Sequence, residues 1–237
     1  MNRSMHPLMP STPGPEDGAH KAPVLSRLVA SLARHARVPA LFVLAATAVA
    51  PLHASQLVPQ NLKQMIHAAD VIVTGEVTRV TDGVENGLPF TEVTIKVNSS
   101  IKRDMAVGSP YTFRQYGLLK PRKLQDGRYL LTSKIEGMAT LTVGEKATTF
   151  MNKPASRTRM STPVGMAQGK FTYSGTQAAN SFDNRSLFRG MSVDASVLNS
   201  KEAAMLAKTA GPVEGDVLIN FVKRAVKEQW IEKGVMR

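Results

Sequence analysis

The chain has 237 residues, a formal net charge of +12 and no cysteine. This length allows one well-buried domain or two small ones, and the missing thiols exclude a disulfide framework, a thiolate metal site and a cysteine nucleophile. Of the 5 histidines, His67 alone lies after residue 54, which excludes a multi-histidine zinc site in that part, and we expect no cofactor.

Residues 1–54 are typical of a secretion signal preceded by a polar leader. Residues 1–37 are rich in proline and carry three arginines towards their end, ahead of an apolar run over residues 38–52. This run of about 15 residues is shorter than the ~18 expected of a membrane span, and the small residue Ala54 closes it. We therefore expect cleavage near Ser55, no transmembrane span afterwards, and a secreted product that is periplasmic or extracellular. The alternatives are an uncleaved N-terminal anchor and a start at a later methionine.

The spacing of apolar residues predicts a short helix followed by strands. In residues 61–69 apolar side chains recur every three or four positions, which is typical of an amphipathic helix. Residues 71–80 are β-branched, and Gly75 inside this run indicates a bulge or a sharp bend. Residues 91–98 alternate apolar and polar side chains, as a strand with one solvated face does. Turn-forming residues join these two strands over residues 82–89.

Four further short strands are expected, each bordered by Gly, Pro or Asn, at residues 111–116, 128–133, 146–151 and 164–173. Strands at this spacing predict a mainly β fold, a small antiparallel barrel or sandwich over residues 55–175. Residues 176–200 are rich in Ser, Asn and Gly, which indicates a loop or linker. A helical segment over residues 201–237 is expected to pack on the barrel, with a short helix at 201–208 and a longer one at 212–233.

The longer helix is strongly amphipathic. One continuous apolar stripe is formed by Val217, Leu218, Phe221, Val222, Ala225 and Val226. A stripe this wide predicts docking on the barrel, with Trp230 partly buried at its margin. The alternative is a helix that stays free to recruit a partner.

Five segments carry a family resemblance: ADVIVTGEV (69–77), KVNSSIK (96–102), GEKATTFMNKPAS (144–156), VGMAQGKF (164–171) and NSFDNRSLF (180–188). They resemble a bacterial family of uncharacterised exported proteins over residues 57–190, and the VGxxQGKF-type motif is the most specific of them. The resemblance implies a β-rich exported domain with no assigned chemistry. More loosely, the helix and the strands after it resemble the OB-fold barrel of netrin-like and metalloprotease-inhibitor-like domains. Those domains depend on cysteines that this chain lacks, so inhibitor function does not carry over.

Gln168 and Lys170 are the first candidate binding residues if this family shares a site. Their motif is similar to a phosphate-binding loop, but it has one residue too few between its glycines, and Phe171 stands where that loop has Ser or Thr. Nucleotide binding is therefore not expected. The alternative is a structural motif, in which Gly165 and Gly169 allow a tight bend, Lys170 faces solvent and Phe171 packs.

Residues 111–123 interleave aromatic and basic side chains, a pattern with which OB-type barrels hold single nucleic-acid strands. The candidate binding residues in this segment are Arg114, Tyr116, Lys120, Arg122 and Lys123. Strand alternation instead favours core packing for Tyr111 and Phe113, which share one face with Gln115. We expect no specific nucleic-acid recognition.

These observations favour a non-enzymatic exported protein that binds a partner protein or an anionic envelope component. Residues 55–237 carry a net charge of +9, because five cationic and two acidic residues of the total 30 and 18 precede them, and such a balance attracts polyanions. No catalytic residue is assigned, since no Ser or Asp pattern accompanies His67. The alternative is an uncharacterised secreted hydrolase with a carboxylate-based site. Two acidic side chains in one cleft would favour the hydrolase, and a basic aromatic groove or an apolar patch would favour binding.

Overall fold

The structure is a computed structural model that describes residues 57–124, 126–131 and 135–237, all of which belong to one unit, Ser55–Arg237. The expected signal and leader at residues 1–54 lie outside the described residues. Within the described part, no helix is both long enough and apolar enough to cross a bilayer.

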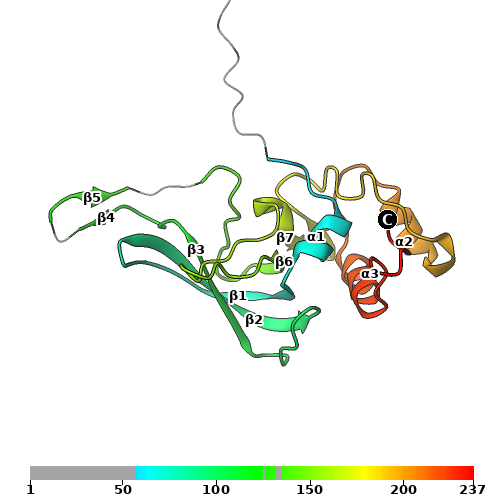
Figure 1. The fold of residues 1–237 in the computed structure, drawn as a ribbon, viewed down its shortest axis with the longest axis horizontal. Coiled ribbons are helices and arrows are strands. Elements are labelled where there is room, and N and C mark those ends of the chain that lie inside the picture. The colour runs from blue at the N-terminus through cyan, green and yellow to red at the C-terminus, as the bar shows by residue number, and fades with distance from the viewer. Residues whose placement is uncertain (1–56, 125, 132–134) are drawn as a thin grey trace, which may run out of the picture. The chain divides into compact units, whose positions relative to one another are not determined.

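A seven-stranded antiparallel sheet in the order β3-β2-β1-β6-β7-β8-β9 forms the centre of the fold (Figure 1). Its strands are β1 (Val71–Glu85), β2 (Leu88–Ser100), β3 (Pro110–Tyr116), β6 (Lys146–Met151), β7 (Lys170–Ser174), β8 (Gln177–Ala179) and β9 (Val213–Glu214). A separate pair joins β4 (Arg122–Lys123) and β5 (Tyr129–Leu130). The mainly β prediction is confirmed. No closed barrel is found among the described strands, because β3 and the two-residue β9 each pair with one neighbour and leave the sheet open.

β1 and β2 form a long hairpin whose turn and bend depend on glycine. Asn86 and Gly87 have φ values of 50° and 77°, the two-residue turn that an Asn-Gly pair favours. The turn expected over residues 82–89 is therefore shorter than predicted. The register shifts at Gly75, which confirms the predicted bulge. A side chain at Gly75 would overlap the carbonyl oxygen of Lys96, so the bend requires glycine.

The other expected strands agree with the structure in part. Strands at 111–116 and 146–151 are confirmed as β3 and β6. Of the strand expected at 128–133, residues 128–131 are described, and two of them form β5. The interval 164–173 starts with a short 3-10 helix, η1 (Met166–Gly169), because the chain must turn before it can enter β7.

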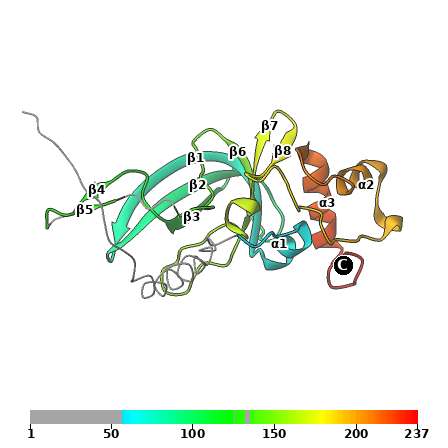
Figure 2. The same cartoon turned by 90° about the horizontal axis from the view of Figure 1, so that it is seen from above.

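Three α-helices gather at the β7–β9 end of the sheet (Figures 1 and 2), namely α1 (Leu62–Ala68), α2 (Ser200–Leu206) and α3 (Gly215–Lys227). The helices predicted at 61–69 and 201–208 are confirmed. The last helix is shorter than predicted, because Pro212 precedes β9 and α3 ends at Lys227 instead of residue 233.

A tight C-terminal closure ends α3 and buries Trp230. Gln229 has a φ of 58°, its N–H donates to the carbonyl of Val226 at 3.2 Å, and the N–H of Trp230 donates to that of Ala225 at 2.9 Å. The closure turns Trp230 back against Phe221, with ring centroids 5.4 Å apart and an edge-on geometry. Trp230 is 1% exposed, so the expectation of partial burial was wrong in degree.

The two faces of the sheet carry separate apolar cores. On the face toward the helices, sheet residues pack against the apolar stripe of α3, and this core includes Ile72, Phe150, Phe171, Leu218, Phe221 and Val222. The opposite face is covered by the segment that precedes β6, and this core includes Val73, Val93, Ile95, Phe113, Ala139 and Leu141. The last helix therefore docks on the sheet, and its stripe is occupied within the chain.

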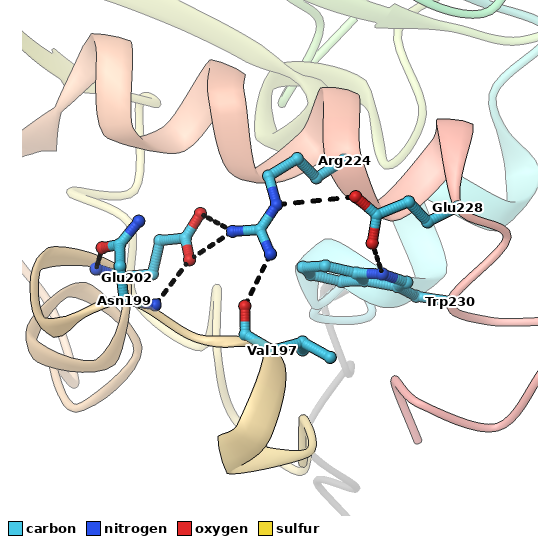
Figure 3. Close-up of polar contacts among 6 residues, drawn as sticks. All are labelled: Val197, Asn199, Glu202, Arg224, Glu228 and Trp230. Atoms are coloured by element: carbon cyan, nitrogen blue, oxygen red, sulfur yellow. Dashed lines mark hydrogen bonds and ion pairs between the residues drawn. The ribbon is translucent and has the colours of Figure 1, made fainter.

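Polar contacts around Arg224 tie α2 to α3 (Figure 3). The guanidinium of Arg224 donates to both carboxylate oxygens of Glu202 at 2.9 Å. Glu202 also accepts from the N–H of Asn199, whose side chain caps the first turn of α2 in return. Glu228 accepts from the indole N–H of Trp230 at 2.7 Å. Because the buried Glu202 is fully paired, this cluster has a structural role.

The interval 176–200, expected to be a loop or linker, is tied into the fold. It contains β8 and the 3-10 helix η2 (Ala195–Val197) and is otherwise irregular. Leu187 and Phe188 enter the core beneath the helices. The buried amide of Asn184 donates to the carbonyls of Ala178 and Gly211, each at 3.0 Å.

Candidate functional site

The VGMAQGKF motif forms a tight bend between η1 and β7. Gly165 has a φ of 61°, and a side chain at Gly169 would overlap the carbonyl oxygen of Val164, so the bend predicted at these glycines is confirmed. Gln168 is buried and accepts from the N–H of Gln60 at 2.7 Å. Phe171 is fully buried, as predicted.

Lys170 is buried, whereas the structural interpretation of the motif placed it in solvent. Its ammonium donates to the carbonyl of Thr140 at 2.6 Å and to the carboxylate of Glu145 at 2.8 Å. A buried cation must be paired, and these two groups satisfy it. In the same motif, the backbone N–H of Ala167 donates to the carbonyl of Gly137 at 2.8 Å. The motif therefore holds residues 137–145 against the sheet.

Of the basic residues predicted to bind in segment 111–123, the two arginines form ion pairs and the two lysines form none with the described residues. Arg114 pairs with Glu92 at 2.7 Å and with Glu85 at 2.9 Å, and it lies 4.2 Å from the ring centre of Phe90. Arg122 pairs with Asp82 at 2.6 Å. Two exposed lysines, Lys120 and Lys123, make no ion pair within the part of the chain that the structure describes.

Asp82 anchors the segment that follows β3. Its carboxylate accepts from the N–H of Leu119 at 2.8 Å as well as from Arg122. Burial opposes ionisation, but the hydrogen bonds from Leu119 and Arg122 outweigh it and hold the pKa of Asp82 below its usual value. The charged carboxylate thus fixes residues 119–122 beside the β1–β2 hairpin, at the end of the sheet opposite the helices (Figures 1 and 2).

A groove of about 400 Å³ opens between the end of β3, the residues that follow it up to 119, and residues 135–141. We call it the Gln115 groove; its apolar walls come from Val93, Leu118, Leu119, Met138, Ala139 and Leu141. Gly137 and Thr140 also line it, and these are the residues that the VGMAQGKF motif holds from below. The groove volume lies within the range of ~300–1,000 Å³ that is usual for ligand sites.

Gln115 lines this groove and carries an unsatisfied polar atom. The residue is 7% exposed, and its side-chain amide N–H donates to the carbonyl of Ala139 at 3.0 Å. Its carbonyl oxygen Oε1 has no hydrogen-bond partner among the described residues. A buried acceptor without a donor costs about 1–3 kcal/mol, and a ligand that donates a hydrogen bond would remove this cost.

Exposed apolar side chains form the rim of the Gln115 groove. Tyr116, Leu119 and Ile135 line it and are 38%, 49% and 40% exposed. Tyr129 on β5 and Leu131 directly after this strand are more exposed still, although neither lines the groove. A gathering of large exposed apolar residues beside a cleft is typical of an interaction site.

The hydrolase alternative requires two acidic side chains in one cleft, and a candidate pair lies outside the Gln115 groove. Glu214 and Asp216 share a pocket of about 500 Å³ between α2 and the start of α3. Both side chains are exposed, and Glu214 already accepts from the amide of Gln177. His67 is exposed on α1, and the described residues contain no group of three or more His, Cys, Asp or Glu that could hold a metal.

Comparison of the chain with protein-family models, curated proteins and solved structures finds no match. The assignment of a site therefore depends on geometry. Of the predicted residues, Tyr116 lines the Gln115 groove, and Arg114, Lys120, Arg122 and Lys123 come from β3 and the chain that follows it. Lys170 supports the groove wall, and Gln168 lines a separate pocket with Leu57 and Phe182. Sequence reasoning missed Gln115, although a polar residue on the apolar face of a strand was a visible signal.

Proposed function

We propose that this chain is an exported, non-enzymatic binding protein whose Gln115 groove takes an extended segment of a partner protein. The observation that carries the proposal is the buried, unpaired Oε1 of Gln115, a residue that lines this apolar groove. A backbone N–H of a bound segment would satisfy this oxygen while an apolar side chain of the same segment filled the groove.

Charge complementarity favours an acidic partner segment. Lys120 follows the rim residue Leu119 in the chain and Lys123 lies on β4, and neither makes an ion pair in the described part. Glu136 is the one acidic residue among the described residues that line the groove. Acidic residues next to the apolar anchor would be attracted to these lysines, mainly by faster association. The proposed occupant is therefore a segment with one large apolar residue beside Asp or Glu.

Export to the periplasm or the extracellular space is part of this proposal and is supported by the signal-like residues 38–54. Membership in the exported bacterial family is likewise proposed, on the segments that resemble it. Two of these segments meet in space, because the amide of Asn180 donates to the carbonyl of Gln168 at 3.1 Å. We also propose a relation to OB-type barrels, and α1 followed by the bent β1–β2 hairpin supports it.

Selection of short random peptides displayed on phage tests the proposal. Peptides would be selected on the purified chain and counter-selected on a Leu119→Asp variant, which alters the exposed rim. We expect the enriched peptides to carry a large apolar residue next to Asp or Glu. Val107→Asp is the matched control, because Val107 is 78% exposed in the loop before β3.

Two variants then separate the contribution of the Gln115 hydrogen bond to peptide binding from that of the lysine charges. Gln115→Met keeps the side chain's length without its carbonyl, and we expect about tenfold weaker binding of a selected peptide. Lys120→Gln combined with Lys123→Gln should weaken binding chiefly at low salt. The proposal fails if no peptide is enriched over the Leu119→Asp background, or if selected peptides bind both of these variants as tightly as the unmodified chain. Circular dichroism checks that each variant is folded.

A further inference from the structure

A further pocket lies on the face of the sheet opposite the Gln115 groove, toward the helices. It encloses about 270 Å³ and is bordered by β1, β2, β6, β7 and one side of α3. This volume falls just below the usual range of ~300–1,000 Å³ for ligand sites, which limits an occupant to a small molecule or a small group of a larger one. The lining is mainly polar, in contrast to the Gln115 groove.

Two lysines from different elements line this pocket. Lys146 belongs to β6 and Lys223 to α3. Neither makes an ion pair within 4 Å in the described residues. Asp216 also lines the pocket, so the three charged side chains leave a formal charge of +1. The Nζ of Lys146 lies 4.5 Å from the ring centre of Tyr173, and this cation–π contact positions it at the pocket.

Neutral hydrogen-bonding groups complete the lining. The side chains of Asn98, Ser99 and Asn220 face this pocket and make no side-chain hydrogen bond to the rest of the described chain. On the sheet side, the hydroxyl of Tyr173 is 2.8 Å from that of Thr148. Thr148 is in turn 2.8 Å from the hydroxyl of Thr74, which also lines the pocket.

The sheet side of the pocket is preorganised. Thr74 and Thr148 are buried in paired strands, so their hydroxyls are held in place. Burial raises the pKa of Tyr173, the hydrogen bonds from Thr148 and Thr74 oppose this, and the Asp216 carboxylate acts in the same direction as burial. Tyr173 therefore presents a neutral hydroxyl at neutral pH. A ligand would meet these fixed hydroxyls together with exposed lysine and asparagine side chains.

We infer that this pocket binds a small anion through a phosphate or sulfate group. Such a group offers several acceptor oxygens in tetrahedral directions, and the lining of this pocket presents donors from five elements. Lysine is well suited to a phosphate as a compact point charge. The inferred site is separate from the Gln115 groove and does not depend on its function.

Isothermal titration calorimetry with inorganic phosphate, inorganic sulfate, glucose 6-phosphate and glucose tests the inference on the purified chain. We expect saturable binding of at least one anionic probe and none of glucose. Tighter binding of glucose 6-phosphate than of inorganic phosphate assigns the site to a phosphate ester, and the reverse order assigns it to the free ion. Absence of binding by all three anionic probes overturns the inference.

Matched lysine variants separate a site from general positive charge. Lys146→Gln and Lys223→Gln should each weaken binding about tenfold, because each removes a charged hydrogen bond. Lys96→Gln on β2 and Lys227→Gln on α3 make the same charge change at exposed positions that do not line the pocket. Equal weakening by the pocket and control variants overturns the inference. All four lysines are exposed, so folding should be retained, and Leu119→Asp should leave anion binding unchanged.

Discussion

Lys170 shows how one buried charge can position a distant surface. The Lys170→Met variant keeps the length of the side chain but leaves the Glu145 carboxylate, which is 16% exposed, without its cation. We expect the free energy of unfolding to fall by about 2 kcal/mol, measured by urea denaturation. Peptide binding to the Gln115 groove should weaken as well, because Lys170 holds Thr140 in the groove wall.

Lys153→Met is the control for this prediction, since Lys153 is exposed in the loop after β6. It should change the stability by less than about 0.5 kcal/mol, as most surface substitutions do. A Lys170→Met variant as stable as this control would contradict the structural role given to Lys170.

Titration of Tyr111 makes the stability of the folded chain depend on pH in the alkaline range. Burial raises its pKa from 10.0 to about 12, while Arg103 lowers it and Asp70 raises it to a smaller extent. Between pH 10 and about 12 the unfolded chain loses this phenol proton and the folded chain keeps it. Stability from this group is therefore complete below pH 10 and decreases as pH rises, by at most about 1.4 kcal/mol per pH unit.

The Tyr111→Phe variant tests this titration by urea unfolding at pH 9 and pH 11, which lie on either side of the ordinary tyrosine pKa of 10.0. We expect it to lose less stability than the unmodified chain between these two conditions. Tyr129→Phe, at a tyrosine that is 62% exposed, should lose as much as the unmodified chain. The same loss in all three proteins would show that Tyr111 does not titrate differently on unfolding.

At the scale of elements, the docking of α3 determines which apolar surface remains free. Its stripe is buried against the sheet and α1, and the closure after Lys227 returns Trp230 to the same core. Arg224 then connects α3 to α2 through Glu202 (Figure 3). Within the described chain, no large apolar residue of α3 is exposed, whereas Tyr116, Leu119 and Ile135 at the Gln115 groove are exposed and could recruit a partner.

The fluorescence of Trp230 tests the docking, because the chain has one tryptophan. We expect blue-shifted emission from the unmodified monomer, since the indole is 1% exposed. Phe221→Asp should shift the emission to the red by removing the ring contact and burying a charge. Asn220→Asp adds the same charge on the exposed side of α3 and should leave the spectrum unchanged. A water-exposed spectrum in the unmodified chain would contradict the docked helix.

At the scale of the whole molecule, the proposed export predicts that the chain is cleaved after the apolar run of residues 38–52. We expect the exported product to begin at or within a few residues of Ser55, measured by mass spectrometry of periplasmic or supernatant material. Replacing the small residue Ala54 by Asp should block or shift cleavage. An intact N-terminus in the membrane fraction would instead support the uncleaved anchor.

Local rules of sequence were sufficient for much of the fold. Apolar spacing located α1, α2, β3 and β6, and Gly75 located the bulge in β1, because helical period, strand alternation and the glycine backbone are properties of adjacent residues. The core position of Phe113 and the bend at VGMAQGKF follow in the same way.

The candidate groove could not be located by such rules. Gln115 is polar on an apolar strand face, but only the tertiary structure shows that Ala139 takes its N–H and that its oxygen is left unpaired. The sequence by itself determined the β-rich character, the absence of thiol chemistry and the basic charge of the chain. Tertiary structure decided that Lys170 is buried, that Arg114 and Arg122 are paired, and that the sheet stays open. Each of these depends on contacts between residues far apart in the chain, and no local pattern encodes them.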